Sequence, residues 1–174
     1  MSVKDTLRAF LLKRNRCKEP TGIVPLGKVH KVVTIMNVDD PQYDVCRDTI
    51  QAWYRKNNIR GEVFFIDFRK LIEKERLTTS ITNTILRKDL DIFGRPKADK
   101  MRVLENLKAD MVIVLPTIED SYPLDYLVAC CHAGCRVGRT GCGGGIYDIE
   151  LTPDKEMTQL EFFHAIIVWL EKIQ

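Results

Sequence analysis

Apolar residues follow two spacings along the chain, one typical of strands and one typical of helices. Short apolar runs predict strands over residues 30–38, 61–66, 82–86, 110–115, 135–138 and 147–151. An amphipathic spacing of about 3.6 residues predicts helices over residues 3–15, 43–56, 97–108, 122–132 and from 158 to the end of the chain. The run 82–86 alternates with polar residues, which favours an edge strand.

The order of these elements predicts the fold. Strands that alternate with helices are typical of a parallel sheet with right-handed crossovers and with helices on both faces. We therefore predict an α/β fold, namely a three-layer, Rossmann-like, mostly parallel sheet with the strand order 3-2-1-4-5-6. A single domain is expected over residues 1–174, with an extra N-terminal basic amphipathic helix in 1–18, a connector in 19–29 and the sheet core in 30–174.

The composition fits one ordinary globular domain. Of the 174 residues, 45% are hydrophobic and 29% are charged, and a domain of similar length buries roughly 70% of its unfolded surface. The longest apolar runs are far shorter than the roughly 20 residues that cross a bilayer, so no membrane span is expected. Residues 1–16 lack the pattern of a secretory signal, so the expected location is the cytoplasm, where the six cysteines would be thiols.

Positive charge is concentrated near the amino terminus. The whole chain carries a formal net charge of +3, whereas residues 1–31 hold eight lysines and arginines against two acidic residues. Leu7, Phe10 and Leu11 recur at helical spacing in this stretch and are expected to pack the helix on the body. A solvated helix is the simpler interpretation of the charge, and binding to nucleic acid, an acidic protein partner or an anionic membrane surface is the alternative.

The phosphate-binding motifs of common nucleotide enzymes are missing. A G-x-G-x-x-G run should follow the first strand of a dinucleotide-binding fold, but residues 37–41 read Asn-Val-Asp-Asp-Pro, and no G-x-x-x-x-G-K-[ST] run occurs. The glycine-rich stretch 138–145 joins two predicted strands and opens no helix, so we interpret it as a flexible connector. Asp39 and Asp40 resemble the acidic pair of a receiver domain, but Leu115 stands near the place of its phosphorylated aspartate. No cofactor is therefore expected.

The densest group of soft metal ligands in the sequence consists of Cys130, Cys131, His132, Cys135 and Cys142. Structural zinc sites place paired ligands on turns, whereas three of these residues are neighbours on one predicted helix, where successive side chains point about 100° apart. A cysteine also packs well as a small buried apolar side chain. We therefore predict a packing role for this group and no bound metal.

Polar residues gather where the predicted strands end. In an open α/β sheet, ligands bind over the carboxyl ends of the strands, at the point where the strand order reverses between the first and the fourth strand. We expect a small-molecule site there, lined by Asn37, Asp39, Thr117 and Glu119, with Arg139 reaching in from the glycine-rich stretch. Because acidic groups outnumber cations along that rim, a cationic, polar or metal-bridged ligand is favoured.

A second candidate site lies at the start of the helix predicted over 97–108. The sequence Gly-Arg-Pro-Lys at residues 94–97 sets two cations beside that helix start. Arg95 and Lys97 could together hold a phosphate or a carboxylate. A proline-initiated helix with solvated charges is the simpler interpretation.

Four motifs together resemble a family of small bacterial proteins classed as a domain of unknown function. They are Lys-Asp-Leu-Asp-Ile-Phe-Gly-Arg-Pro-Lys at 88–97, Tyr-Pro-Leu-Asp-Tyr at 122–126, Arg-Val-Gly-Arg at 136–139 and Tyr-Asp-Ile at 147–149. The likeness covers about residues 1–172 and includes the basic first helix. The resemblance implies a shared fold and implies no particular activity.

Residues 109–138 are also similar to the strand-helix-strand unit in the N-terminal half of heptosyltransferase-like glycosyltransferases. The likeness rests on the apolar run 110–115 and on the leucine, alanine and glycine positions that follow it. Those enzymes hold their nucleotide-sugar in a second domain of similar size, which this sequence does not contain. Transferase activity by this chain alone is therefore not expected.

These patterns favour a binding role over catalysis. The sequence offers no recognisable pairing of a nucleophile with a base, and its basic helix is a candidate surface for a protein or nucleic acid partner. We therefore expect a non-enzymatic binding or assembly protein. The alternative is an enzyme or sensor that acts on a small polar ligand, related to a sugar or a nucleotide, at the carboxyl ends of the central strands.

Overall fold

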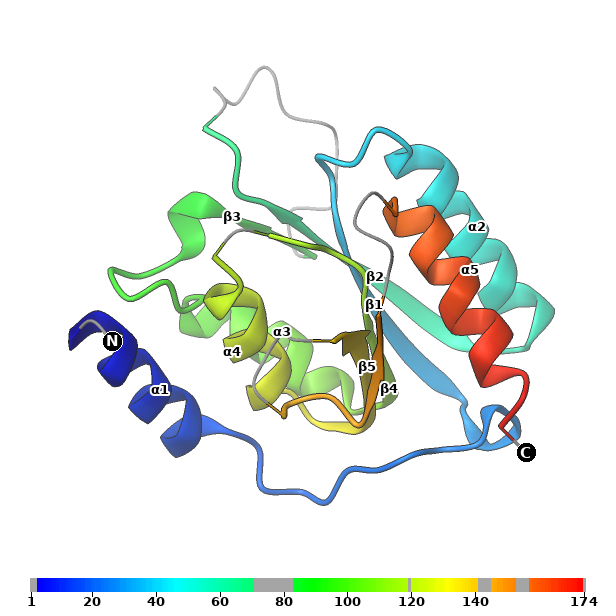
Figure 1. Ribbon diagram of the computed structural model, residues 1–174, viewed down its shortest axis with the longest axis horizontal. Helices are drawn as coiled ribbons and strands as arrows, with labels where there is room; N and C mark the ends of the chain where they lie inside the picture. Colours follow the sequence, from blue (N-terminus) through cyan, green and yellow to red (C-terminus); the bar gives the residue numbers. More distant parts are fainter. Residues whose placement is uncertain (1–2, 71–82, 119, 141–144, 153–156, 174) are drawn as a thin grey trace.

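The computed structural model describes residues 3–70, 83–118, 120–140, 145–152 and 157–173 (Figure 1). Its helices are α1 (Val3–Asn15), α2 (Tyr43–Lys56), α3 (Ala98–Leu107), α4 (Tyr122–Cys130) and α5 (Gln159–Leu170). Its strands are β1 (Lys31–Asn37), β2 (Arg60–Asp67), β3 (Thr84–Leu86), β4 (Ala109–Val114), β5 (Ala133–Arg139) and β6 (Ile149–Leu151). Each predicted helix and strand is present, with bounds that differ by a few residues. The helices in these ranges are all too short or too polar to cross a membrane.

The described strands form one sheet in the order β3-β2-β1-β4-β5-β6, and every neighbouring pair is parallel. This confirms the predicted α/β fold and its strand order. Strand β1 lies at the centre, where Val32 pairs with Gly61 of β2 and Met111 of β4. The order reverses between β1 and β4, so the loops that follow these two strands lead away from each other and leave room between them.

Side chains of β1 alternate between two cores, one on each face of the sheet. Val32 and Met36 belong to the core that α2 and α5 cover, which also holds the buried Phe162 ring. Val33 and Ile35 belong to the opposite core, which α3 and α4 cover. Figure 1 shows the resulting three layers, with α2 and α5 on one side of the sheet and α3 and α4 on the other.

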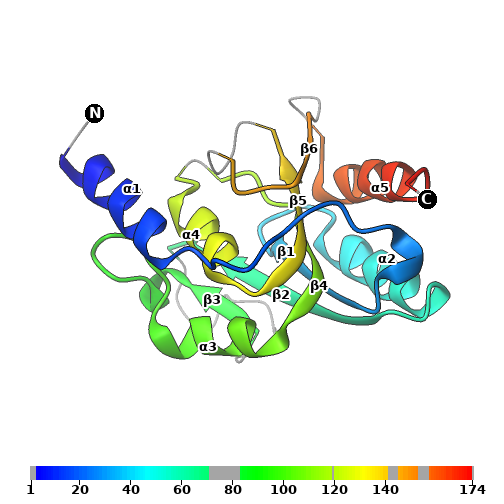
Figure 2. The same cartoon turned by 90° about the horizontal axis from the view of Figure 1, so that it is seen from below.

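Helix α1 lies outside these three layers, beside α4 (Figures 1 and 2). Leu11 packs against the core of α3 and α4, as the sequence predicts. Phe10, however, is 57% exposed, and Leu7 is 36% exposed. The prediction that Leu7 and Phe10 pack the helix on the body is therefore wrong, because Arg8 and Leu12 occupy the face of α1 that contacts it.

The first turn of α5 fixes the carboxyl end of β1. Thr158 caps α5 and forms a capping box with Glu161, which sets the helix start. The buried Gln159 then exchanges two hydrogen bonds with the backbone of Asn37: the Asn37 N–H donates to Oε1 at 2.7 Å, and Nε2 donates to the Asn37 carbonyl oxygen at 2.8 Å. The Asn37 side chain turns into the following loop, where it accepts the N–H of Asp39 at 3.0 Å. Asn37 and Asp39 are thus held at the carboxyl end of β1.

Candidate functional site

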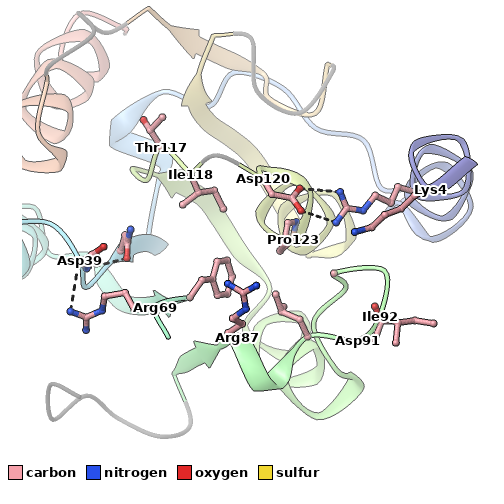
Figure 3. Close-up of a pocket in the computed structure, with 15 residues that line it drawn as sticks. Lys4, Asp39, Arg69, Arg87, Asp91, Ile92, Thr117, Ile118, Asp120 and Pro123 are labelled. Carbon is pink, nitrogen blue, oxygen red and sulfur yellow. Dashed lines mark hydrogen bonds and ion pairs between the residues drawn. The ribbon is translucent and has the colours of Figure 1, made fainter. Parts of the chain in front are cut away.

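A cavity of about 630 Å³ opens over the carboxyl ends of β1 and β4 (Figure 3). Its walls come from the loops after β1, β2 and β4, from the segment after β3 and from α1. The predicted residues Asn37, Asp39 and Thr117 line it. The cavity therefore lies where the topology of the sheet predicts a small-molecule site.

The charge of this strand-end cavity differs from the acidic rim that the sequence analysis expected. Its described acidic side chains are Asp39, Asp91 and Asp120. Its described cationic side chains are Lys4, Arg8, Arg69 and Arg87. The cations come from α1 and from the segments after β2 and β3, and not from the ends of the two central strands. Positive and negative side chains are nearly equal in number. The cavity therefore repels an anion less than the acidic residues at the strand ends would by themselves.

The cations differ in what they already contact. Arg69 lies 3.0 Å from Asp67 and 3.5 Å from Asp39, and its hydrogen bond to Asp67 raises the pKa of the guanidinium above its usual value. Arg87 and Lys4, in contrast, form no close ion pair with any residue that the structure describes, although the charge of Lys4 acts at longer range to lower the pKa of Asp120. Figure 3 shows both of them beside the cavity. Their charges are therefore the ones best placed to meet a ligand.

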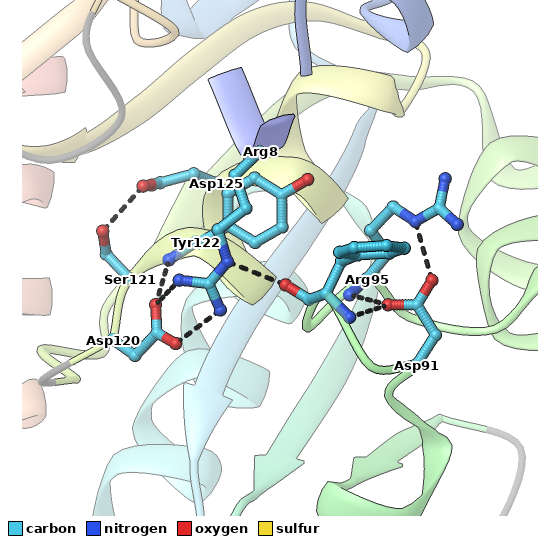
Figure 4. Close-up of polar contacts among 8 residues, drawn as sticks. Arg8, Asp91, Arg95, Asp120, Ser121, Tyr122 and Asp125 are labelled. Atoms are coloured by element: carbon cyan, nitrogen blue, oxygen red, sulfur yellow. Dashed lines mark hydrogen bonds and ion pairs between the residues drawn. The ribbon is translucent and has the colours of Figure 1, made fainter. Parts of the chain in front are cut away.

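Helix α1 is docked as one wall of the cavity through Arg8 (Figure 4). The Arg8 guanidinium donates two hydrogen bonds to Asp120, at 2.8 and 3.1 Å, and one to the Phe93 carbonyl oxygen, at 2.8 Å. It also stacks on the Tyr122 ring, 4.5 Å from the ring centroid. Burial raises the pKa of Asp120, but the hydrogen bonds and charge of Arg8, the Tyr122 N–H and the charge of Lys4 together outweigh it and hold that pKa below its usual value. One cation of the basic helix thus fixes it to the body.

Replacing Arg8 with methionine should release α1 from the cavity wall. The substitution keeps an unbranched side chain but removes the hydrogen bonds to Asp120 and Phe93, and a hydrogen bond to a charged group is worth about 1.5–3 kcal/mol, or less where water reaches it. We expect the amides of α1 to exchange with deuterated solvent at least about tenfold faster, while those of β1 keep their protection. The matched control is Arg14→Met at an exposed position of α1. Equal exchange in the two variants would contradict an anchoring role for Arg8.

The predicted residue Arg139 lines an adjoining cavity of about 300 Å³, which also includes Asn37. Its buried guanidinium donates from Nε to the Leu115 carbonyl oxygen at 2.9 Å and lies 4.1 Å from the centroid of the Phe162 ring. Arg139 therefore contributes to the packing between β5 and α5 as well as to the rim. Glu119, the remaining predicted residue, lies outside the described part of the chain.

At the alternative anion site before α3, Arg95 and Lys97 already bind other groups of the protein. Arg95 donates from Nε to Asp91 Oδ2 at 2.7 Å, and Asp91 Oδ1 accepts two backbone N–H groups of the same turn, at 2.9 Å each. Gly94 adopts φ +90° in this turn, a conformation that favours glycine. Lys97 Nζ donates to the Lys88 carbonyl oxygen at 2.8 Å. Arg95 and Lys97 line a separate cavity of about 410 Å³ and not the strand-end cavity.

Comparison with known protein families places the whole chain in one group. A family model described as a family of unknown function (DUF6913) matches residues 1–173. The chain belongs to DUF6913. The match confirms the resemblance to a domain of unknown function and extends over the basic helix as well as the sheet. No curated protein and no solved structure matches the chain, so the similarity of residues 109–138 to glycosyltransferases stays a prediction.

In this DUF6913 chain, three cysteines of the cysteine-rich group are buried. Burial raises the pKa of Cys130 to about 12 and the pKa values of Cys131 and Cys135 to about 11. Thiols with such values remain protonated at neutral pH and are poor nucleophiles. This agrees with the predicted packing role for the three residues, while Cys142 lies outside the described residues.

Four cationic residues of the cavity were not predicted from the sequence. Most of them lie on segments whose position beside the cavity does not follow from the strand order. Lys4 and Arg8 are four residues apart on one helix, which signals a shared face but not the surface that the face meets. Arg69 follows the buried Asp67 at the end of β2, and this was a visible strand-end signal. Arg87 lies in a short turn after the edge strand and had no sequence signal of its own.

Proposed function

We propose that this chain is a non-enzymatic binding protein that takes a small polar ligand with an anionic group, such as a phosphate or a carboxylate, in the strand-end cavity. The observation that carries the proposal is the position of Arg87 and Lys4, which line one cavity from distant parts of the chain and form no close ion pair with the described residues. Each of these cations can donate charge-assisted hydrogen bonds to an anion in the cavity. Arg69 lies at the same rim, but it is already paired with Asp67 and Asp39.

The remaining lining suits the organic part of such a ligand. Phe68, Leu90 and Ile118 are partly buried and form apolar wall, while Asn37 and Thr117 offer polar groups that can bind hydroxyls. A cavity of about 630 Å³ is within the range of about 300–1,000 Å³ that is usual for small-molecule sites. A phosphorylated or carboxylated compound related to a sugar or a nucleoside fits these features.

The state of the cavity carboxylates supports binding without catalysis. Burial raises the pKa of Asp91, but hydrogen bonds from Arg95 and the neighbouring backbone outweigh this and hold the pKa below its usual value. Asp120 is held in the same way by Arg8. A carboxylate that is ionised at neutral pH has no proton to give to a substrate, and the hydrogen bonds that lower its pKa also make it a weaker base. These two groups thus act as parts of the wall.

An assembly role for α1 is a second candidate, because three large apolar side chains are exposed on it. Val3, Leu7 and Phe10 are 87%, 36% and 57% exposed and lie three and four residues apart, on one stripe of the helix. If this stripe joins two copies of the chain, light scattering at micromolar concentration will give the mass of a dimer, and Phe10→Glu will give the mass of a monomer. A monomer in both samples would leave the ligand-binding role as the sole candidate.

The ligand-binding proposal is tested by titration with ribose 5-phosphate, followed by the amide signals of ¹⁵N-labelled protein. We expect the largest shifts at Thr117 and Asn37 and much smaller shifts with ribose, which lacks the phosphate. Arg87→Gln should weaken ribose 5-phosphate binding by about 10–100-fold, the loss expected for one charged hydrogen bond. Arg60→Gln is the matched control, since Arg60 is exposed at the opposite end of β2.

Two outcomes would overturn this proposal. Shifts centred on Arg95 and Lys97 would place the anion site before α3 instead. Equal binding by the Arg87 and Arg60 variants would show that the strand-end cations do not hold the anion.

A further inference from the structure

Three side chains of the kinds that bind metals converge at the amino edge of the sheet, opposite the strand-end cavity. Cys17 and Glu19 lie on the connector between α1 and β1, and His132 lies between α4 and β5. Cys17 Sγ is 3.8 Å from His132 Nδ1, and Glu19 Oε2 is 3.0 Å from the same nitrogen. The three ligand atoms all lie within 4.8 Å of one another.

Both neighbours approach one nitrogen of His132, and this distinguishes the group from a catalytic relay. In a relay of nucleophile, imidazole and carboxylate, the two partners bind opposite nitrogens of the ring. Nδ1 carries either a proton or a lone pair, so it cannot accept from the Cys17 thiol and donate to the Glu19 carboxylate at the same time. A cation between the three atoms would instead receive a lone pair from each of them.

The two separations measured from His132 Nδ1 fit a tetrahedral zinc ion, and Cys17 Sγ and a Glu19 carboxylate oxygen lie within 4.8 Å of each other. With a Zn–S bond of about 2.3 Å and Zn–N and Zn–O bonds of about 2.0 Å, tetrahedral angles separate S from N by about 3.5 Å and N from O by about 3.3 Å. The observed separations of 3.8 and 3.0 Å are close to these values. A thiolate and a carboxylate together neutralise the charge of a divalent ion, and imidazole binds it as a neutral ligand.

The connector is held in place by contacts outside the ligand group. The Cys17 N–H donates to the Ala129 carbonyl oxygen at 2.9 Å, and the Gly22 N–H donates to the Gly134 carbonyl oxygen at 2.9 Å. Figure 2 shows the connector running past the end of α4 toward β1. These bonds place Cys17 beside His132 before any ion arrives. The Glu19 side chain is exposed and the His132 side chain is partly exposed, so an ion can reach the group from solvent.

We propose that Cys17, Glu19 and His132 form a zinc site that clips the connector to the junction of α4 and β5. A thiolate and an imidazole favour zinc over magnesium or calcium, which prefer oxygen ligands. Three protein ligands leave the fourth position for water. These residues are not all neighbours in the sequence, and only His132 belongs to the cysteine-rich group. Since the connector continues directly from α1, the clip also steadies the helix that forms one wall of the strand-end cavity.

The test uses untagged full-length protein, kept reduced by a phosphine and stripped of metal by a chelator. We expect it to bind one zinc ion per chain and to melt at a higher temperature with zinc than in chelator. Cobalt in place of zinc should give a thiolate-to-metal absorption band that Cys17→Ser abolishes. His132→Ala should weaken zinc binding by more than about 100-fold, because loss of a ligand exceeds the 10–100-fold effect of losing an outer partner. His164→Ala, at an exposed position of α5, is the matched control.

The melting temperature in chelator separates a metal role from a folding defect. If the site exists, the Cys17 and His132 variants will melt close to the unsubstituted protein in chelator and will gain nothing from zinc. The proposal is overturned if zinc raises the melting temperature of all of them equally, or if the cobalt protein shows no thiolate band. It is equally overturned if the unsubstituted protein binds zinc no more tightly than His132→Ala.

Discussion

Replacing Phe162 with alanine is expected to lower the free energy of unfolding by about 3–5 kcal/mol, the usual loss for a large aromatic side chain in a core. Phe162 is 0% exposed and belongs to the core between the sheet and α5. The Arg139 guanidinium lies 4.1 Å from the ring centroid, so the variant also removes a cation–π contact. Urea denaturation followed by circular dichroism measures the change.

Phe10→Ala is the control for this prediction, because it makes the same truncation on a ring that is 57% exposed. Its expected effect is within about 0.5 kcal/mol, as for most surface substitutions. A loss at Phe10 as large as the loss at Phe162 would mean that α1 packs through Phe10 after all. That packing is what the helical spacing predicts, so the pair of variants also tests whether Phe10 is free of it.

The fold was predictable because the signals that determine it are local. The run 30–38 is apolar on both faces, as a central parallel strand must be, and β1 is indeed buried on both sides. The polar alternation of 82–86 indicated an edge, and β3 is the edge strand beside β2. Right-handed crossovers then leave few arrangements for strands that alternate with helices, so the strand order followed from the element order.

The residues of the site that follow the central strands were predictable for the same reason. The residue that α1 contributes through its docking was not. Asn37 and Thr117 follow directly from where two central strands end. The position of Arg8 depends on how α1 docks, which is decided by Asp120 and the Tyr122 ring more than one hundred residues later. Helical periodicity identifies a face of α1 but does not say whether apolar contacts or a cation will fix that face.

The role of a glycine in the glycine-rich stretch is another feature that the sequence alone does not determine. Gly138 was predicted both as the last residue of a strand and as the first residue of a flexible connector, and it lies inside β5, which continues to Arg139. A Cβ at this position would lie 2.5 Å from the Tyr147 ring, so glycine allows that ring to pack on the strand. A run of glycines in the sequence does not distinguish a residue needed for close packing from residues needed for a turn.

Gly61→Val is expected to destabilise the protein by about 3 kcal/mol or more, at the upper end of what overpacking costs. A Cβ at Gly61 would overlap the Cγ, Cδ2 and Cε2 atoms of the Tyr54 ring. That ring cannot turn aside freely, because its hydroxyl is hydrogen-bonded to Thr34 Oγ1 at 2.6 Å in a buried position. The substitution must therefore break this bond or shift β2 away from α2. Urea denaturation measures the loss.

Two further variants give this prediction its controls. Gly27→Val should change stability little, because nothing lies within 4 Å of a Cβ at Gly27. Gly61→Ala should be clearly destabilising in the native background but nearly neutral when added to Tyr54→Ala, since the second change removes the ring that the new Cβ would meet. Equal losses of stability in the two backgrounds would show that glycine is needed at position 61 for its backbone conformation and not for the space it leaves to the Tyr54 ring. In that case the packing of α2 on β2 would have to be explained by other residues.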